Sequence, residues 1–193
     1  MIKLPYHQKS VIIGLLLARR AGWLTFSSLK NKNARLGFKQ SLDRSTYVLF
    51  VFNLLSHYCS SGPRLITNAR AGKTHYALQF FTRALPCFTT LHSLFYSQGF
   101  KIIPSNIYDI LTPVALTHLI MGDGKARPHG LELCADSFTI PEVVKLMNVL
   151  IIRYQLDCIL RLHTPTQPRI YIREGSMSKL KAIVEPYMHP SMM

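Results

Sequence analysis

The residues best placed to do chemistry are Asp123 and the two glycines beside it, Gly122 and Gly124. They end an apolar stretch that predicts a short buried helix from Pro113, with a left-handed glycine expected at its end. A carboxylate there is repelled by the helix dipole, and a divalent cation would relieve the repulsion. The alternative is a Gly-Asp-Gly turn whose aspartate bonds its own backbone, and this stretch taken alone favours that turn.

The charge of the chain is strongly positive and unevenly distributed. The formal net charge is +14. Residues 1–100 hold thirteen Lys and Arg against one acid, Asp43, whereas residues 101–193 hold ten against eight acids. Because no run of five like charges occurs, the charge is expected on a folded surface. Such a surface indicates a polyanionic partner.

Length and composition predict a folded chain. It has 193 residues and 48% hydrophobic content, enough for one sizeable domain or two small ones sharing a core. No membrane partner is expected, because the longest apolar runs are too short to span a bilayer. No two of the four cysteines are spaced as a zinc pair, so we expect buried, reduced thiols at Cys59, Cys87, Cys134 and Cys158.

Two similar series of elements are predicted along the chain. The first is a helix over 11–20 capped by Ser10, a strand over 34–40, a helix over 42–58, strands over 64–67 and 75–83, and a helix over 86–96. The second is a helix over 113–121, a strand over 131–136, a helix over 143–154 opened by a capping box, strands over 158–163 and 169–173, and a helix over 176–187. The repeated order predicts a pseudo-dimer whose interface is formed by the two short apolar helices.

Several motifs together carry a family resemblance. They are residues 34–41, 57–62, 81–87, 112–124, 130–139, 168–173 and 186–192. With them the chain resembles a single-chain LAGLIDADG homing endonuclease of the type encoded in organellar group I introns. The resemblance implies an α+β fold of pseudo-twofold duplicated αββαββα halves, with two saddle-like antiparallel sheets and the motif helices at the interface. The halves are 1–100, with a degenerate motif, and 113–193, joined by a linker over 101–112.

The resemblance also implies an activity: Mg²⁺-dependent hydrolysis of phosphodiester bonds in a long, specific double-stranded DNA site, by a monomer. It makes Asp123 a catalytic residue and the metal ligand of the second half. Gln40 and Asp136, which match between the halves, occupy the place of a polar residue near the attacking water. Arg83 and Arg173 match likewise and occupy the place of a basic residue near the phosphate. Ordinary DNA-face or surface contacts remain an equally open interpretation of these four residues.

Basic residues on the predicted strands and their connections are expected to contact nucleic acid. They are Arg35, Lys39, Arg70, Lys73, Lys125, Arg161 and Arg169.

The first motif departs from the family pattern, because no acid precedes Asp43. In an alignment without a gap, Arg19 takes the place of the family's acid. In an alignment with a two-residue insertion, which passes over Arg19 and Arg20, Ala21 takes that place. Arginine suits a helix C-terminus but is a poor metal ligand, and its guanidinium would compete with Mg²⁺ by pairing with Asp123. We therefore expect double-strand cleavage to be weakened, reduced to nicking, or lost.

Two other functions remain open. One is a maturase, an RNA-binding cofactor that helps its host group I intron to fold. The other is a decayed endonuclease that still binds its DNA site without cutting it. Because the family is encoded within organellar introns, the resemblance also implies a mitochondrial location.

Overall fold

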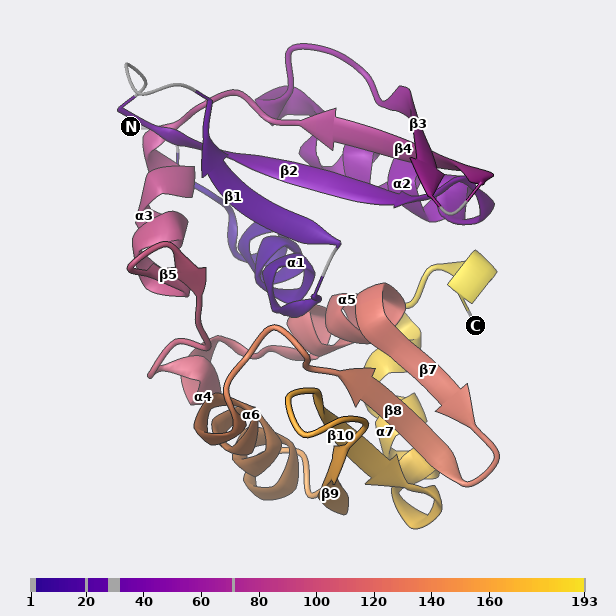
Figure 1. Cartoon of the computed structure of the whole chain (residues 1–193). Coiled ribbons are helices and arrows are strands. Elements are labelled where there is room, and N and C mark those ends of the chain that lie inside the picture. The colour runs from indigo at the N-terminus through magenta and orange to yellow at the C-terminus, as the bar shows by residue number, and fades with distance from the viewer. Residues whose placement is uncertain (1–2, 20, 28–31, 71, 193) are drawn as a thin grey trace.

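The protein consists of two similar halves, each built on a four-stranded antiparallel sheet (Figure 1). The computed structural model describes residues 3–19, 21–27, 32–70 and 72–192. The strand order is β1-β2-β4-β3 in the first sheet and β7-β8-β10-β9 in the second. The same order in both sheets confirms the expected duplication.

The first half runs helix, two strands, helix, two strands, helix. Its elements are α1 (Tyr6–Leu17), β1 (Gly22–Phe26), β2 (Ala34–Ser41), α2 (Ser45–Leu55), β3 (Arg64–Arg70), β4 (Lys73–Phe81) and α3 (Pro86–Phe95). The segment that follows was expected to be a linker. It contains a short ladder of β5 (Tyr96–Ser97) with β6 (Phe100–Lys101), and the single-turn helix α4 (Ile107–Ile110).

The second half repeats this order. Its elements are α5 (Pro113–Asp123), β7 (Gly124–Arg127), β8 (Gly130–Cys134), α6 (Ile140–Ile152), β9 (Cys158–Leu162), β10 (Pro168–Arg173) and α7 (Met177–Val184). The predicted capping box opens α6, because Thr139 and Glu142 exchange both of its hydrogen bonds. The αββαββα order of both halves is confirmed.

The residue patterns missed the first strand of each half and misplaced some helix ends. Strands β1 and β7 begin within five residues of a motif helix, where the sequence pattern was assigned to the helix end or left open. Ser10 is a buried residue inside α1, which begins at Tyr6 after Pro5, so the expected cap at Ser10 is wrong. The helix predicted over 42–58 is α2 flanked by two 3-10 turns, Leu42–Arg44 and Ser56–Tyr58.

Helices α1 and α5 pack side by side between the two sheets (Figure 1). Small residues allow this close approach: a Cβ on Gly14 would lie 2.3 Å from the carbonyl oxygen of Ala115, and one on Gly122 would lie 2.6 Å from the Cβ of Ala18. The expected left-handed glycine at the end of α5 is wrong, because Gly122 is helical and Gly124 is extended with φ −70°. These glycines serve close packing instead of a left-handed turn.

Each sheet buries one face against helices and leaves the other open. On β2, Leu36 and Phe38 are buried toward the helices, whereas Arg35 and Lys39 alternate with them and are half-exposed. Helices α2 and α3 pack on the first sheet, and α6 packs on the second. The two open faces are therefore available to a partner.

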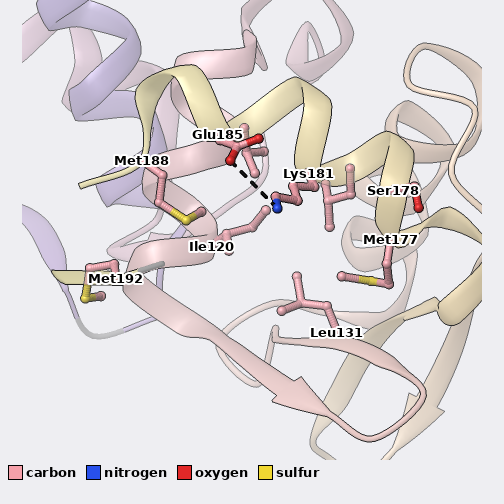
Figure 2. Close-up of a pocket in the computed structure, with 10 residues that line it drawn as sticks. Ile120, Leu131, Met177, Ser178, Lys181, Glu185, Met188 and Met192 are labelled. Carbon is pink, nitrogen blue, oxygen red and sulfur yellow. Dashed lines mark ion pairs between the residues drawn. The ribbon is translucent and has the colours of Figure 1, made fainter. Parts of the chain in front are cut away.

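A cavity of about 520 Å³ lies between α5, β8 and α7, apart from the predicted site residues (Figure 2). Its walls are mainly apolar, and Lys181 and Glu185 form an ion pair beside it at 3.8 Å.

Within the described ranges no helix has the length and apolarity to cross a bilayer. The four cysteines are free thiols, of which Cys158 is buried and the others are half-buried.

Candidate active site

Asp123 lies at the meeting point of the two halves, as the last residue of α5. Its Oδ2 accepts a hydrogen bond from the backbone N–H of Arg19, just beyond the end of α1. The interpretation of residues 122–124 as a turn in which the aspartate bonds its own backbone is therefore wrong. The carboxylate instead faces the other half of the molecule.

The packing of the two helices shows which residue of the first motif lies against Asp123. Arg19 and Asp123 are 104 residues apart. The same spacing separates Gly14 from His118 and Ala18 from Gly122, although Gly14 also meets Ala115, and Gly122 also meets Ala21, at a spacing of 101. These pairs fit the alignment without a gap, in which Arg19 stands opposite Asp123. The strands that follow begin at Gly22 and Gly124, 102 residues apart, so two extra residues lie between the first motif helix and its strand. Ala21 is buried, and its carbonyl oxygen accepts a hydrogen bond of 3.0 Å from the Lys39 N–H; Arg20 lies outside the described residues.

Two basic side chains that the sequence did not single out hold the C-terminal ends of the motif helices. Arg44 Nη1 donates to the carbonyl oxygens of Met121 and Gly122 at 3.0 and 3.2 Å. Lys101 Nζ donates to the carbonyl oxygens of Gly22 and Ala18 at 2.8 and 3.4 Å. Both place positive charge at the negative end of a helix, which offsets the cost of putting a carboxylate there.

The ionisable groups at this junction perturb one another. Burial raises the pKa of Asp123, against the opposing effects of the Arg19 N–H and the charges of Lys101, Arg19 and Arg44. Burial also lowers the pKa of Lys101 to about 8, while the charge of Asp123 acts in the other direction. A perturbed acid beside a perturbed base in one partly buried place is typical of functional sites.

The guanidinium of Arg19 was expected to pair with Asp123, but it pairs with Asp136. Arg19 Nη1 forms an ion pair with Asp136 Oδ2, and the two side chains are 27% and 1% exposed. Arg169 Nε lies 3.6 Å from the other carboxylate oxygen of Asp136. Asp136 is thus enclosed by two arginines, one from each half.

The sequence match of Gln40 with Asp136 is shifted by one residue in the structure. Gly22 and Gly124 begin β1 and β7 and pair with Phe38 and Leu133. Counting onward from these partners, Asp136 corresponds to Ser41. Gln40 pairs with Leu78 and has the strand parity of the core residue Phe38.

Arg83 and Arg173 are not brought to Asp123. Arg83 Nη2 donates to the carbonyl oxygen of His57 at 2.8 Å, at the end of β4. Arg173 pairs with Gly130 across the sheet, whereas Gly124, next to Asp123, pairs with Leu133, three residues further along β8. The Nη1 of Arg173 lies 3.2 Å from Asp157 Oδ2. Both guanidinium groups contact loops of their own half.

The basic residues predicted for nucleic-acid binding lie on the strands of the two sheets. Arg35 and Lys39 lie on the open face of β2, and Lys125 is exposed on β7. Arg161, on β9, lies over the ring of Tyr171 at 3.5 Å. Arg70 and Lys73 pair at the tip of the β3–β4 hairpin, and their side chains lie outside the described part of the structure.

On the second sheet, part of the positive charge is neutralised by one acid that the sequence reasoning did not consider. Glu132 Oε1 accepts hydrogen bonds from Arg169 Nη1 at 2.6 Å and Arg127 Nη2 at 2.8 Å. Burial acts to raise the pKa of Glu132, but these two hydrogen bonds and charges outweigh it and lower the pKa. Alternation in β8 places Glu132 on the open face, opposite in parity to the core residue Leu133.

The residues at the junction fit a cation held by one carboxylate. Among the described residues no group of three or more His, Cys, Asp or Glu is arranged to hold a metal ion. Mg²⁺ is usually bound by one or two carboxylates together with waters and substrate phosphates. Asp123 offers one such ligand, whereas Asp136 is taken by Arg19.

The family follows from comparison with known proteins. The model of the LAGLIDADG DNA endonuclease family matches residues 9–180. The chain belongs to this family.

Relatives include the cytochrome b mRNA maturase bI2 of Debaryomyces hansenii, 32% identical over 166 residues, 83% of this chain and 63% of that protein. The intron-encoded endonuclease ai4 of Dictyostelium discoideum is 33% identical over 116 residues, 59% of this chain and 73% of that protein. The chain thus spans less than two thirds of the length of the Debaryomyces relative.

Solved structures share the fold. The homing endonuclease I-WcaI bound to its DNA recognition sequence matches with a TM-score of 0.90 and 24% identity, over 100% of this chain and 86% of that one. I-DmoI in complex with DNA and Mn matches with a TM-score of 0.58 and 10% identity, over 93% of this chain and 96% of that one. At these identities the likeness establishes the duplicated fold.

Proposed function

We propose that the chain binds a long double-stranded DNA site and hydrolyses one of its two strands, with a divalent cation held at Asp123. The observation that carries this proposal is the pairing at the junction: the carboxylate that ends α5 accepts a hydrogen bond from Arg19, just beyond the end of α1. One half offers a metal ligand, and the other offers a cation in the equivalent place. The name of the Dictyostelium relative and the DNA-bound structures of the same fold support a DNA endonuclease.

The open faces of the two sheets are the proposed DNA surface. Their strands alternate between core residues and residues that point outward, which suits a sheet lying in a groove. In this proposal the basic residues contact phosphates and fix the register, while polar residues between them read base edges.

Each residue of the junction has a proposed part in the reaction. The bound Mg²⁺ would polarise the phosphodiester and lower the pKa of a bound water. Asp123 would hold it. Arg44 would fix the end of α5, which carries Asp123, and Lys101 would fix the end of α1 that lies against it. Asp136 would hold the guanidinium of Arg19 in place. We assign Gln40, Arg83 and Arg173 to support or DNA contacts within their own halves.

The test is a nicking assay. A supercoiled plasmid carrying the joined exon sequences that flank the reading frame is incubated with the protein and Mg²⁺. We expect open-circular product and little linear product from the wild type, and neither from Asp123→Asn, which should still bind the site. Product from Asp123→Asn at the wild-type rate would reject the assignment of the metal to Asp123.

A maturase is the second candidate, favoured because two relatives are named cytochrome b mRNA maturase bI2. Splicing of the host group I intron RNA would be compared with and without the protein. For a maturase, Asp123→Asn should keep splicing activity while losing cleavage.

For either function we propose a monomer that acts in the mitochondrion, with residues 1–100 and 113–193 as its two halves.

A further inference from the structure

A polar cavity of about 330 Å³ lies at one end of the open face of the first sheet, where β3 begins. The register explains which side chains meet there. Arg64 pairs with Gln79, and Phe81 follows two residues later on the same face. Phe81 pairs with Gly37, which places Arg35 two residues along β2 on that face. The Ser60-Ser61 turn completes the wall.

Arg35 is held in an unusual state within this cavity. Its guanidinium carbon lies 4.1 Å above the ring of Phe81, and its Nε is buried without a hydrogen-bond partner. A buried donor without an acceptor is unfavourable, so this guanidinium has hydrogen-bonding capacity that the protein alone does not satisfy. Stacking on Phe81 limits the guanidinium to one plane, which suits bidentate binding of an oxyanion.

The lining favours an anion rich in oxygen. Two arginines, Arg35 and Arg64, line it together with Ser60, Ser61 and Gln79, and none of its lining residues is an acid. We propose that this cavity binds one backbone phosphate of the DNA, gripped by Arg35 and Arg64. The inference rests on the proposed function, because it assigns a subsite to the same DNA surface.

The equivalent place in the second half is already filled. Strand register makes Tyr171, Arg161 and Arg169 the counterparts of Phe81, Arg64 and Gln79. There Arg161 lies over the Tyr171 ring, and Arg169 is bound to Glu132 at 2.6 Å. An anion at that place would meet a carboxylate. The phosphate site is therefore a property of the first half, where the excess positive charge is concentrated.

The cavity lies away from the bond-breaking site. The backbone N–H of Lys39 donates to the carbonyl oxygen of Ala21, close to the end of the motif helix α1. Arg35 lies four residues earlier on β2. Four residues of strand correspond to roughly 13 Å. The site should therefore act on DNA affinity.

The first experiment uses the free protein and inorganic phosphate. The Nε–Hε signal of Arg35 is followed by NMR during a phosphate titration, with sodium chloride at matched ionic strength as the control anion, and is assigned by its loss in Arg35→Lys. We expect a saturable shift at millimolar phosphate that weakens at least fivefold in Arg64→Ala and is unchanged in Lys145→Ala, an exposed cation on α6. The same shift in chloride, or no shift, would overturn the site.

The second experiment uses DNA and separates the inference from the proposed function. Neutral methylphosphonates are placed one at a time along the exon duplex. One position should weaken wild-type binding about fivefold to tenfold and have no further effect on Arg35→Ala. A loss that follows base identity instead of phosphate charge would overturn the phosphate assignment, as would wild-type affinity in Arg35→Ala. Phosphate binding by the free protein without binding of the duplex would reject the proposed function and leave the anion site intact.

Discussion

Among single residues, Arg19 has the largest effect on the electrostatics of the junction, because it stands where the family pattern has an acid. Two carboxylates in equivalent places would repel each other unless cations lay between them. With Arg19 the junction supplies a cation of its own: the guanidinium neutralises Asp136, and the backbone N–H binds Asp123. Both carboxylates at the junction therefore have a partner within the protein itself.

Removing the Arg19 side chain should therefore destabilise the fold. Asp136 is 1% exposed in the wild type, and in Arg19→Ala it keeps only the 3.6 Å contact with Arg169. We expect the free energy of unfolding to fall by about 1–3 kcal/mol, because a buried charge loses a charged hydrogen bond. Urea denaturation measures this change. Lys145→Ala, which removes an exposed cation, should shift the value by less than about 0.5 kcal/mol, and equal values for the two variants would contradict the account.

His118 gives the interface a dependence on pH. It is buried in α5, its Nδ1 is 2.8 Å from the Tyr47 hydroxyl, and His7 and His189 lie around the same small cavity. Burial, with a smaller contribution from His7, lowers its pKa from 6.5 to about 3. Below pH 6.5 the unfolded chain therefore binds a proton that the folded chain does not, and stability is lost as the pH falls from 6.5 toward 3.

The measurement is the free energy of unfolding against pH for wild type and His118→Gln, which keeps an acceptor for Tyr47. The wild type should lose up to about 1.4 kcal/mol per pH unit more than the variant over this window. Above pH 7 the difference between the two proteins should be constant. Parallel curves throughout would show that His118 does not titrate as the structure requires.

At the scale of elements, the crossing of α1 and α5 depends on the absence of side chains at particular positions. A methyl group on Gly14 would meet the backbone of Ala115 at 2.3 Å, so the helices would have to separate. We expect Gly14→Ala to lower stability by about 1–3 kcal/mol despite its better helix propensity. Gly175→Ala is the matched control, because open space surrounds that glycine. Calorimetric melting that ranks the two variants equally would reject this view of the interface.

The second sheet differs from the first because Glu132 neutralises Arg127 and Arg169 on its open face. Glu132→Gln should free these cations for phosphates, raising DNA affinity and steepening its dependence on salt by about 0.9 for each added contact. Fluorescence anisotropy over a salt series measures the slope. Glu174→Gln removes an exposed acid nearby and is the control. An unchanged slope in Glu132→Gln would mean that these arginines do not face DNA.

The sequence predicted elements with strong internal signals and missed those defined by distant partners. Pro113 and the Thr139–Glu142 capping box set helix starts through local chemistry, and both were located correctly. Strands β1 and β7 are short and are defined by pairing with β2 and β8, which the residue pattern does not encode. Lys101 and Arg44 reach the junction from other elements, so only the fold reveals them.

At the scale of the whole molecule, the duplication is nearly symmetric in backbone and asymmetric in charge. The two sheets share one strand order, and the motif helices meet in register. The first half carries the excess of positive charge and the second carries Asp123. This division suits a protein in which one half mainly holds DNA and the other carries out hydrolysis.

The most direct test follows the two DNA strands separately. The exon duplex, labelled differently on each strand, is incubated with Mg²⁺ and wild-type protein, Asp123→Asn or Arg19→Asp. We expect the wild type to cut one strand, Asp123→Asn to cut neither, and Arg19→Asp to gain cleavage of the second strand. Efficient cutting of both strands by the wild type would show that Arg19 does not disable the first half.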